Sequence, residues 1–218
     1  MSAAYPAAQD PHHLGHGKPE DESRGHGGGG PAPVRVVVGY GFWIFLLSDF
    51  VMFSSFFASF AVLANATAAG PSGRQLFSLD SVAWETGCLL ASSFACGLAS
   101  LAAGARSRPW YFVAMAATFA PGAAFLILEG HEFAQLLASG DGPQRSAFLS
   151  AFFALVGCHG VHVTLGLMWL LTMMAQVFAK GFRADILRRI LCFTLFWHAL
   201  DIVWVGIFTV VYLTGVAR

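Results

Sequence analysis

Five long apolar stretches, separated by short polar segments, decide what this 218-residue chain can fold into. A helix needs about 20 apolar residues to cross roughly 30 Å of hydrocarbon, and each stretch reaches that length. Hydrophobicity is continuous through each stretch and does not alternate as it does in a membrane-spanning strand. We therefore predict an all-α membrane protein whose five transmembrane helices form one polytopic bundle, at approximately residues 38–63, 82–103, 110–137, 148–179 and 190–213.

The composition excludes several other classes of protein. Hydrophobic residues make up 56% of the chain and charged residues only 11%, against roughly 45–50% and about 25% in soluble domains. Twelve Lys and Arg balance twelve Asp and Glu, so no excess of positive charge favours nucleic acid as a partner. The four cysteines lie in apolar stretches without a CxxC spacing, which argues against a disulfide framework or a zinc site.

The first 35 residues differ from the rest of the chain. Pro, Gly, Asp, Glu and His dominate them, and they contain a run of four glycines at 27–30 but no apolar segment of the kind found in a signal peptide. Such a composition cannot bury enough apolar surface to fold. We predict that residues 1–35 form a disordered, His- and Gly-rich tail and that residues 36–218 form the transmembrane domain.

The basic residues predict the orientation of the bundle. Five crossings put the N-terminal end, the 104–109 loop and the 180–189 loop on one side of the membrane. That side carries seven basic residues near membrane ends, namely Arg35, Arg106, Arg108, Lys180, Arg183, Arg188 and Arg189, whereas the opposite side carries Arg74, Arg145 and Arg218. The positive-inside rule then places the N-terminus in the cytoplasm and the C-terminus outside.

Several ionisable residues fall inside the predicted spans, where their burial is costly and usually marks a bundle interior, a pairing or a pathway. Counting residues from the membrane edges places Asp49, His159, His162, His198 and Asp201 near one mid-membrane layer. The two histidines of the fourth span are three residues apart, as are His198 and Asp201, and this spacing predicts one shared helix face for each pair.

A second layer is expected near the outer interface. It contains Glu85 at the start of the second span, with Glu129, His131 and Glu132 at the end of the third. Arg74 and Arg145 lie in the flanking outer loops, where they are available to pair with these acidic side chains.

Three interpretations of the mid-membrane residues remain open on chemistry alone. They can form hydrogen bonds between helices, with Asp49 against a histidine and His198 against Asp201 or a backbone carbonyl. They can conduct protons or influence a proton pathway in a neighbouring subunit. They can ligate haem or a metal, although His159 and His162 lack evident accompanying ligands. In the fourth span, Gly157, Gly160 and Gly166 provide small surfaces that permit close helix contact.

Four segments resemble subunit III of the haem-copper respiratory oxidases. The segment FLSAFFALVGCHGVHVTLG at 148–166 resembles the signature of that family. GFWIFLLSDFVMF at 41–53 and WETGCLL at 84–90 resemble its first and second shared helices, and FWHALDIVW at 196–204 resembles its closing helix. The order and spacing agree from about residue 36 to 215.

Within this family, the chain looks like the cytochrome o (bo-type) ubiquinol oxidase branch. Five spans and a short cytoplasmic tail that contains histidines are similar to that branch, as are the loops at 65–73 and 140–146. Subunit III of cytochrome c oxidases typically has seven spans, with the two extra spans first. Cytochrome c oxidase subunit III is therefore the alternative, and an independent secondary transporter or proton channel is a more distant one, since inverted repeats with broken helices would be expected there.

The resemblance implies an accessory role in the aerobic respiratory chain. A subunit of this kind is not an enzyme on its own and holds no redox cofactor; haem b, haem o and copper belong to subunit I, and ubiquinol binds elsewhere in the complex. Implied partners are subunit I by direct packing, subunits II and IV, and membrane phospholipids held in a cleft. The implied location is the bacterial inner membrane, with a periplasmic C-terminus, and the implied role is to support assembly and stable proton-coupled turnover.

The resemblance also assigns candidate site residues. Asp49 falls where many members of the family carry a buried Glu. Six further residues occupy motif positions and are expected to be structural or to influence proton movement: Glu85, Glu132, His159, His162, His198 and Asp201. Glu129 of the outer layer completes the set of candidate site residues.

Overall fold

A computed structural model of the chain describes residues 33–68 and 79–217, and its described part is built from helices. Five of these are long and apolar enough to cross a membrane, which confirms the predicted fold class. They are α1 (Val34–Leu63), α3 (Leu79–Gly104), α4 (Arg108–Ala138), α5 (Ala147–Lys180) and α6 (Ala184–Ile207). The last span continues through a π-helix, η2 (Phe208–Leu213), into the short α7 (Thr214–Ala217).

The predicted N-terminal tail falls almost entirely on residues 1–32, which lie outside the described residues. The first span begins at Val34, directly after Pro33. This start precedes the boundary that the sequence predicted, because the apolar run Val36–Val38 is preceded by Val34 and Arg35, which also suit a helix.

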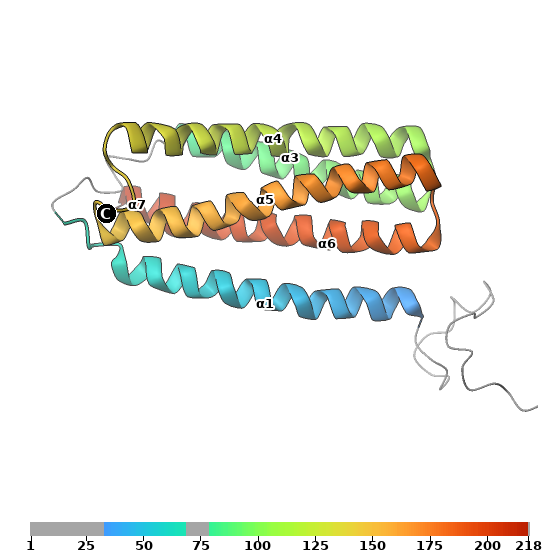
Figure 1. Cartoon of the computed structure of the whole chain (residues 1–218), viewed down its shortest axis with the longest axis horizontal. Helices are drawn as coiled ribbons and strands as arrows, with labels where there is room; N and C mark the ends of the chain where they lie inside the picture. The colour runs from blue at the N-terminus through green and yellow to red at the C-terminus, as the bar shows by residue number, and fades with distance from the viewer. Residues whose placement is uncertain (1–32, 69–78, 218) are drawn as a thin grey trace, which may run out of the picture.

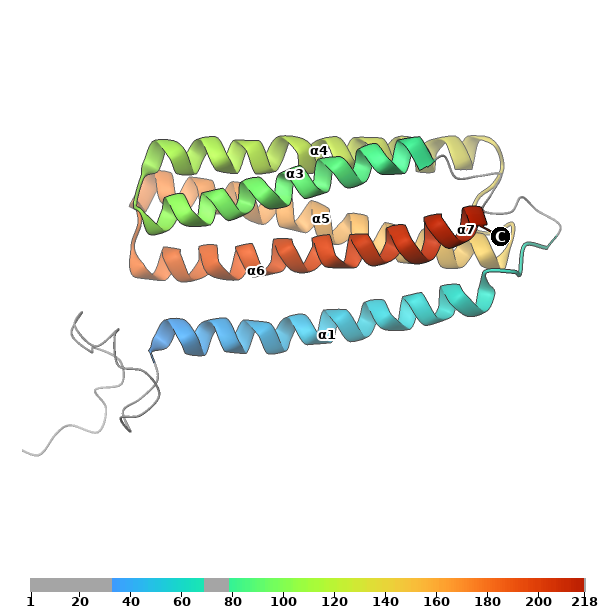
Figure 2. The same ribbon diagram turned by 180° about the vertical axis from the view of Figure 1, so that it is seen from behind.

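α1 lies at the edge of the bundle. In both views it lies along α5 and α6 and away from α3 and α4 (Figures 1 and 2). Its buried side chains are Leu46, Phe53 and Phe60, seven residues apart, so they form a single narrow stripe along the helix. The remaining faces of α1 are left for lipid or for other proteins.

The two ends of the bundle differ in charge. The start of α1, the α3–α4 connection and the α5–α6 connection lie at one end, whereas the α4–α5 connection and the end of the chain lie at the other (Figure 1). All seven basic residues that the sequence grouped on one side belong to the first end, and Arg145 belongs to the second.

Glycines let the helices of the bundle come close. A Cβ added to Gly166 would lie 2.7 Å from the Trp197 ring, one added to Gly160 would lie 2.9 Å from Oε1 of Glu129, and one added to Gly157 would lie 3.6 Å from the Phe133 ring. The predicted small surfaces of the fourth span are therefore contact surfaces.

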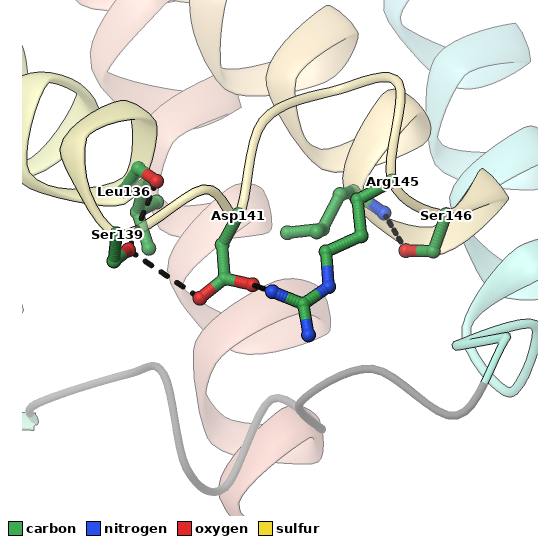
Figure 3. Close-up of polar contacts among 6 residues, drawn as sticks. Leu136, Ser139, Asp141, Arg145 and Ser146 are labelled. Atoms are coloured by element: carbon green, nitrogen blue, oxygen red, sulfur yellow. Dashed lines mark hydrogen bonds and ion pairs between the residues drawn. The ribbon is translucent and has the colours of Figure 1, made fainter.

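The α4–α5 connection corrects one expectation about charge pairing. Arg145 forms an ion pair with Asp141, four residues before it, and not with the acidic residues of the bundle (Figure 3). Asp141 is closer to Arg145 in the sequence than the glutamates of the bundle are. Pairing with Asp141 also keeps the guanidinium of Arg145 out of the apolar interior. The next residue, Ser146, begins α5 by accepting a hydrogen bond from the backbone N–H of Leu149 at 3.2 Å. Arg74 lies outside the described residues.

Candidate functional site

The eight residues predicted as a site fall into three separate groups inside the bundle. One group lies between α1 and α5, a second between α3, α4 and α5, and a third between α3 and α6. The single mid-membrane layer that the sequence suggested is therefore divided among three helix interfaces.

The first group contains Asp49 on α1 and His162 on α5. His162 Nδ1 donates a hydrogen bond to the carbonyl of Cys158 in its own helix, at 2.7 Å. Its ring also packs against Phe53 of α1, with ring centroids 5.2 Å apart. Asp49 interacts electrostatically with Cys158, so these polar groups of α1 and α5 face one interface. Asp49 is half-buried.

The second group is a cluster of acidic residues. Glu85 of α3 is fully buried, Glu129 of α4 is 4% exposed, and Glu132 of α4 is half-buried. Glu85 interacts electrostatically with Glu132, and Glu129 interacts with both. Tyr212 of η2 interacts with all three. We call these four residues the acidic cluster. By contrast, His131 is exposed and does not join it.

His159 lies deeper in the bundle than His162. It is fully buried and surrounded by aromatic rings, with centroids 5.2 Å from Trp204, 5.8 Å from Phe125 and 6.4 Å from Phe53. Neither of its ring nitrogens has a hydrogen-bond partner among residues 33–68 and 79–217. Glu129 packs against the adjacent Gly160. His159 therefore lies among aromatic rings of α1, α4 and α6, next to the acidic cluster, and it shares Phe53 of α1 with His162.

The third group joins α3 to α6. The hydroxyl of Ser93 lies 2.7 Å from Nδ1 of His198, and Asp201 interacts with both residues. This is a hydrogen bond between helices, as one interpretation of the sequence predicted, but the partner of His198 on the other helix is a serine. The geometry differs from that of a Ser-His-Asp hydrolase, where serine bonds Nε2 and aspartate bonds Nδ1.

A second hydrogen-bonded contact between helices was not predicted. Ser92 donates to the carbonyl of Thr118 on α4 at 2.7 Å and accepts from Nε1 of Trp197 on α6 at 3.1 Å. Six residues earlier in α3, Thr86 accepts from Nε1 of Trp204 at 3.1 Å. Two features of the sequence could have indicated these contacts. Ser92 and Ser93 are adjacent hydroxyl residues within an apolar span, and the last span contains two tryptophans, Trp197 and Trp204.

The side chains of these three groups can bind and release protons and can form hydrogen bonds. Within the part of the chain that the structure describes, no three His, Cys, Asp or Glu residues gather in a way that could hold a metal ion. All four cysteines are free thiols, and Cys96 and Cys192 are buried. The fold and these interior groups define a polytopic helical membrane protein with buried polar contacts between its spans.

Comparison with known proteins gives the family. Residues 22–216 match the family described as "Cytochrome c oxidase subunit III". A "Cytochrome bo(3) ubiquinol oxidase subunit 3" from Pseudomonas aeruginosa is 51% identical over 176 residues, which cover 81% of this chain and 84% of the relative. A protein of the same name from Pseudomonas putida is 49% identical, with 81% and 85% covered.

A third relative carries a different name. A "Cytochrome c oxidase subunit 3" from Bacillus sp. (strain PS3) is 41% identical over 179 residues, with 80% of this chain and 84% of the relative covered. The match spans nearly the whole chain outside its first residues, and the relatives are matched over most of their own length. The chain therefore belongs to the cytochrome c oxidase subunit III family, as its motifs indicated.

Proposed function

We propose that this chain is subunit III of a proton-pumping cytochrome o (bo-type) ubiquinol oxidase, which couples ubiquinol oxidation to O2 reduction in aerobic respiration. One observation carries this choice within the family. Identity is 49–51% to two relatives named ubiquinol oxidase subunits and 41% to the relative named a cytochrome c oxidase subunit.

The number of spans supports this choice less than the sequence suggested. The Bacillus cytochrome c oxidase subunit is matched over 84% of its own length, so it is similar in size to this chain and lacks room for a large additional N-terminal unit. Chain length and span number do not separate the two branches. The degree of identity is the basis for preferring a quinol oxidase.

The proposed role is accessory and not catalytic. Subunit I would hold haem b, haem o and copper, and ubiquinol would bind elsewhere in the complex. Hydrogen bonds of Ser92, Ser93 and Thr86 join α3 to α4 and α6, which suits a subunit that maintains the shape of a neighbour. Assembly with subunits I, II and IV, and phospholipid bound between its helices, are part of the proposal.

We place the protein in the bacterial inner membrane with the N-terminus in the cytoplasm and the C-terminus in the periplasm. The support is the gathering of seven basic residues at the end of the bundle that holds the start of α1, the end that the positive-inside rule assigns to the cytoplasm. Residues 1–35 would be a cytoplasmic segment, and residues 36–218 the membrane domain.

The eight site residues have structural or proton-related roles in this proposal. His198 and Asp201 fix the contact of α6 with α3, and His162 and Asp49 shape the contact of α1 with α5. The acidic residues Glu85, Glu129 and Glu132, together with His159, form the polar interior of the outer half of the bundle. None of them is proposed to ligate haem or copper.

Purification of the tagged chain from its native membranes tests the proposal. We expect it to bring with it a haem-copper subunit I and a subunit II without a copper-A centre, visible in the optical spectrum and in peptide masses. The same purification from a strain without the subunit I gene is the control and should yield no haem. Recovery with a copper-A-bearing subunit II would identify a cytochrome c oxidase, and recovery of the chain alone would favour an independent transporter.

A further inference from the structure

Ser93 of α3 lies between two ionisable side chains of α6. Its hydroxyl is 2.7 Å from Nδ1 of His198, and the same side chain forms a hydrogen bond with the carboxyl group of Asp201. His198 and Asp201 are three residues apart on α6, which places both on one face of that helix. The three residues therefore form one hydrogen-bonded series between the two helices, which we call the α3–α6 triad.

The chemistry of the hydroxyl group sets the direction of these hydrogen bonds. A serine hydroxyl donates one proton, and an ionised carboxylate only accepts. When Asp201 is ionised, Ser93 therefore donates to the carboxylate and accepts from the N–H at Nδ1 of His198. In this state the neutral imidazole of His198 carries its proton on Nδ1, and Nε2 has a lone pair that can accept a proton.

The two ends of the triad differ in accessibility. Both ionisable residues line an apolar groove of about 470 Å³ between α3 and α6. Nδ1 of His198 is bonded to Ser93, whereas Nε2 has no partner among the described residues and is not enclosed by them. Oδ1 of Asp201, by contrast, is enclosed and has no donor among the described residues. Nε2 of His198 is therefore the open end of the triad, and the carboxyl group of Asp201 is its inner end.

The surroundings of the triad favour its uncharged forms. The triad lies near the middle of the spans Asp80–Gly104 and Ala184–Leu213, where an ionised side chain is costly. A neutral acid beside a neutral imidazole avoids the desolvation of two ions. Among the described residues, no further titratable or charged side chain lines the groove. Its other residues are Leu90, Phe94, Gly97, Leu98 and Leu101. An added proton is therefore held best on Asp201, with His198 neutral.

We propose that the Ser93 hydroxyl relays a proton from His198 to Asp201. A proton first binds to the lone pair of Nε2. The N–H bond at Nδ1 then breaks as its proton passes to Oγ of Ser93, while the O–H bond of Ser93 breaks as its proton passes to the carboxylate of Asp201. The triad gains one proton: Asp201 becomes a neutral acid, Ser93 regains its hydroxyl group, and neutral His198 now carries its proton on Nε2.

The reverse steps return the proton to Nε2, so the triad takes up and releases one proton at a time. The relay rests on the proposed function, because it gives the proton-related role of His198 and Asp201 a route. It also gives Ser93 a positioning role, since the hydroxyl is the group that connects the base to the acid.

Time-resolved infrared spectroscopy of the purified complex, after light releases protons from a caged acid, tests the relay. We expect the carbonyl band of protonated Asp201 to rise in the unmodified complex and to be absent in Asp201→Asn, which identifies the band. Ser93→Ala interrupts the relay, so the rise should be at least about tenfold slower, whereas Ser93→Thr keeps the hydroxyl group and should stay within about twofold of the unmodified rate.

Ser92→Ala is the matched control. It removes a neighbouring buried hydroxyl group that bonds to α4 and α6 but does not belong to the triad. A purely structural role of Ser93 would be imitated by this variant. We expect Ser92→Ala to leave the rise of the Asp201 band within about twofold of the unmodified rate.

The imidazole bands of His198 give a second readout that does not depend on Ser93→Ala. In the unmodified complex the proton moves on to Asp201, so imidazolium should not accumulate. In Asp201→Asn the relay has no final acceptor, so an imidazolium band should persist after the protons are released. His198→Gln lacks that band and identifies it.

The relay is overturned if Ser93→Ala leaves the rate unchanged, if Ser93→Thr does not restore it, or if Ser92→Ala slows it as much as Ser93→Ala does. It is also overturned if the unmodified complex shows no Asp201 acid band, or if it accumulates as much imidazolium as Asp201→Asn. All of these are measured on the complex that this chain forms, whichever subunits it contains. Purification with a copper-A-bearing subunit II, or without oxidase subunits, would refute the proposed function, which is a different result.

Discussion

The ring of Trp197 on α6 lies against Gly166 of α5 so closely that a Cβ on Gly166 would come within 2.7 Å of it. The same ring lies 3.1 Å from the corresponding position at Gly122 of α4, and Trp197 is 3% exposed. One tryptophan therefore holds α4, α5 and α6 together, and two glycines make room for it.

Gly166→Ala tests this contact. Because the tryptophan is enclosed, the added methyl group forces a shift of packed side chains or of a helix, and overpacking of this kind costs about 1–3 kcal/mol. We expect the purified complex to release this subunit, or unfold it, at a lower temperature in a thermal-shift measurement. Gly87→Ala is the matched control, since its Cβ would meet no atom within 4 Å; a loss of stability there as large as at Gly166 would contradict the account.

Ser92→Ala tests the hydrogen-bonded contact between α3, α4 and α6. The substitution leaves the Trp197 N–H and the Thr118 carbonyl without their buried partner, and such a loss costs about 1–3 kcal/mol. Ser54→Ala is the control, because Ser54 is exposed and bonds only to the carbonyl of Phe50 in its own helix. Thermal unfolding should separate the two variants, and equal midpoints would show that the Ser92 contact adds no stability.

The α4–α5 connection allows a cap and an ion pair to be compared. Ser146→Ala removes the buried N-cap of α5 and should cost about 1 kcal/mol. Arg145→Ala breaks the solvent-exposed ion pair with Asp141 (Figure 3), which we expect to cost about 0–1 kcal/mol. Denaturation curves of the two variants in the same detergent show which one loses more stability. A larger loss in Arg145→Ala than in Ser146→Ala would contradict this prediction.

Asp49→Asn tests the role of the carboxylate between α1 and α5. We expect proton-linked turnover or subunit retention to fall while the reduced-minus-oxidised haem spectrum of the complex stays unchanged, because no residue of this chain is proposed as a haem ligand. Asp49→Glu keeps the carboxyl group and is the control. A shifted haem spectrum in Asp49→Asn would place this residue in contact with a cofactor and contradict the assignment.

The spans were predictable from the sequence because hydrophobicity over 20 or more residues leaves helices as the solution in a membrane. The arrangement of the polar residues was less predictable. Residues three apart on a helix differ in direction by about 60°. Both histidine rings of α5 reach Phe53 of α1, but only His159 also packs against Phe125 of α4 and Trp204 of α6. A shared face therefore did not mean a shared site.

Other parts of the interior gave weak signals or none. The partner of His198 is Ser93, and a serine in an apolar stretch does not reveal whether it bonds to its own helix or to another. The π-helix at Phe208–Leu213 contains no proline or glycine that would have predicted it. Tyr212 lies in this π-helix, so its electrostatic interaction with the three glutamates was not predicted.

Oxygen consumption by the purified complex that contains this chain is the most direct test of its assignment to a quinol oxidase. We predict that ubiquinol supports oxygen uptake and that reduced cytochrome c does not. Uptake driven by cytochrome c without response to ubiquinol would contradict the assignment and place the chain in a cytochrome c oxidase.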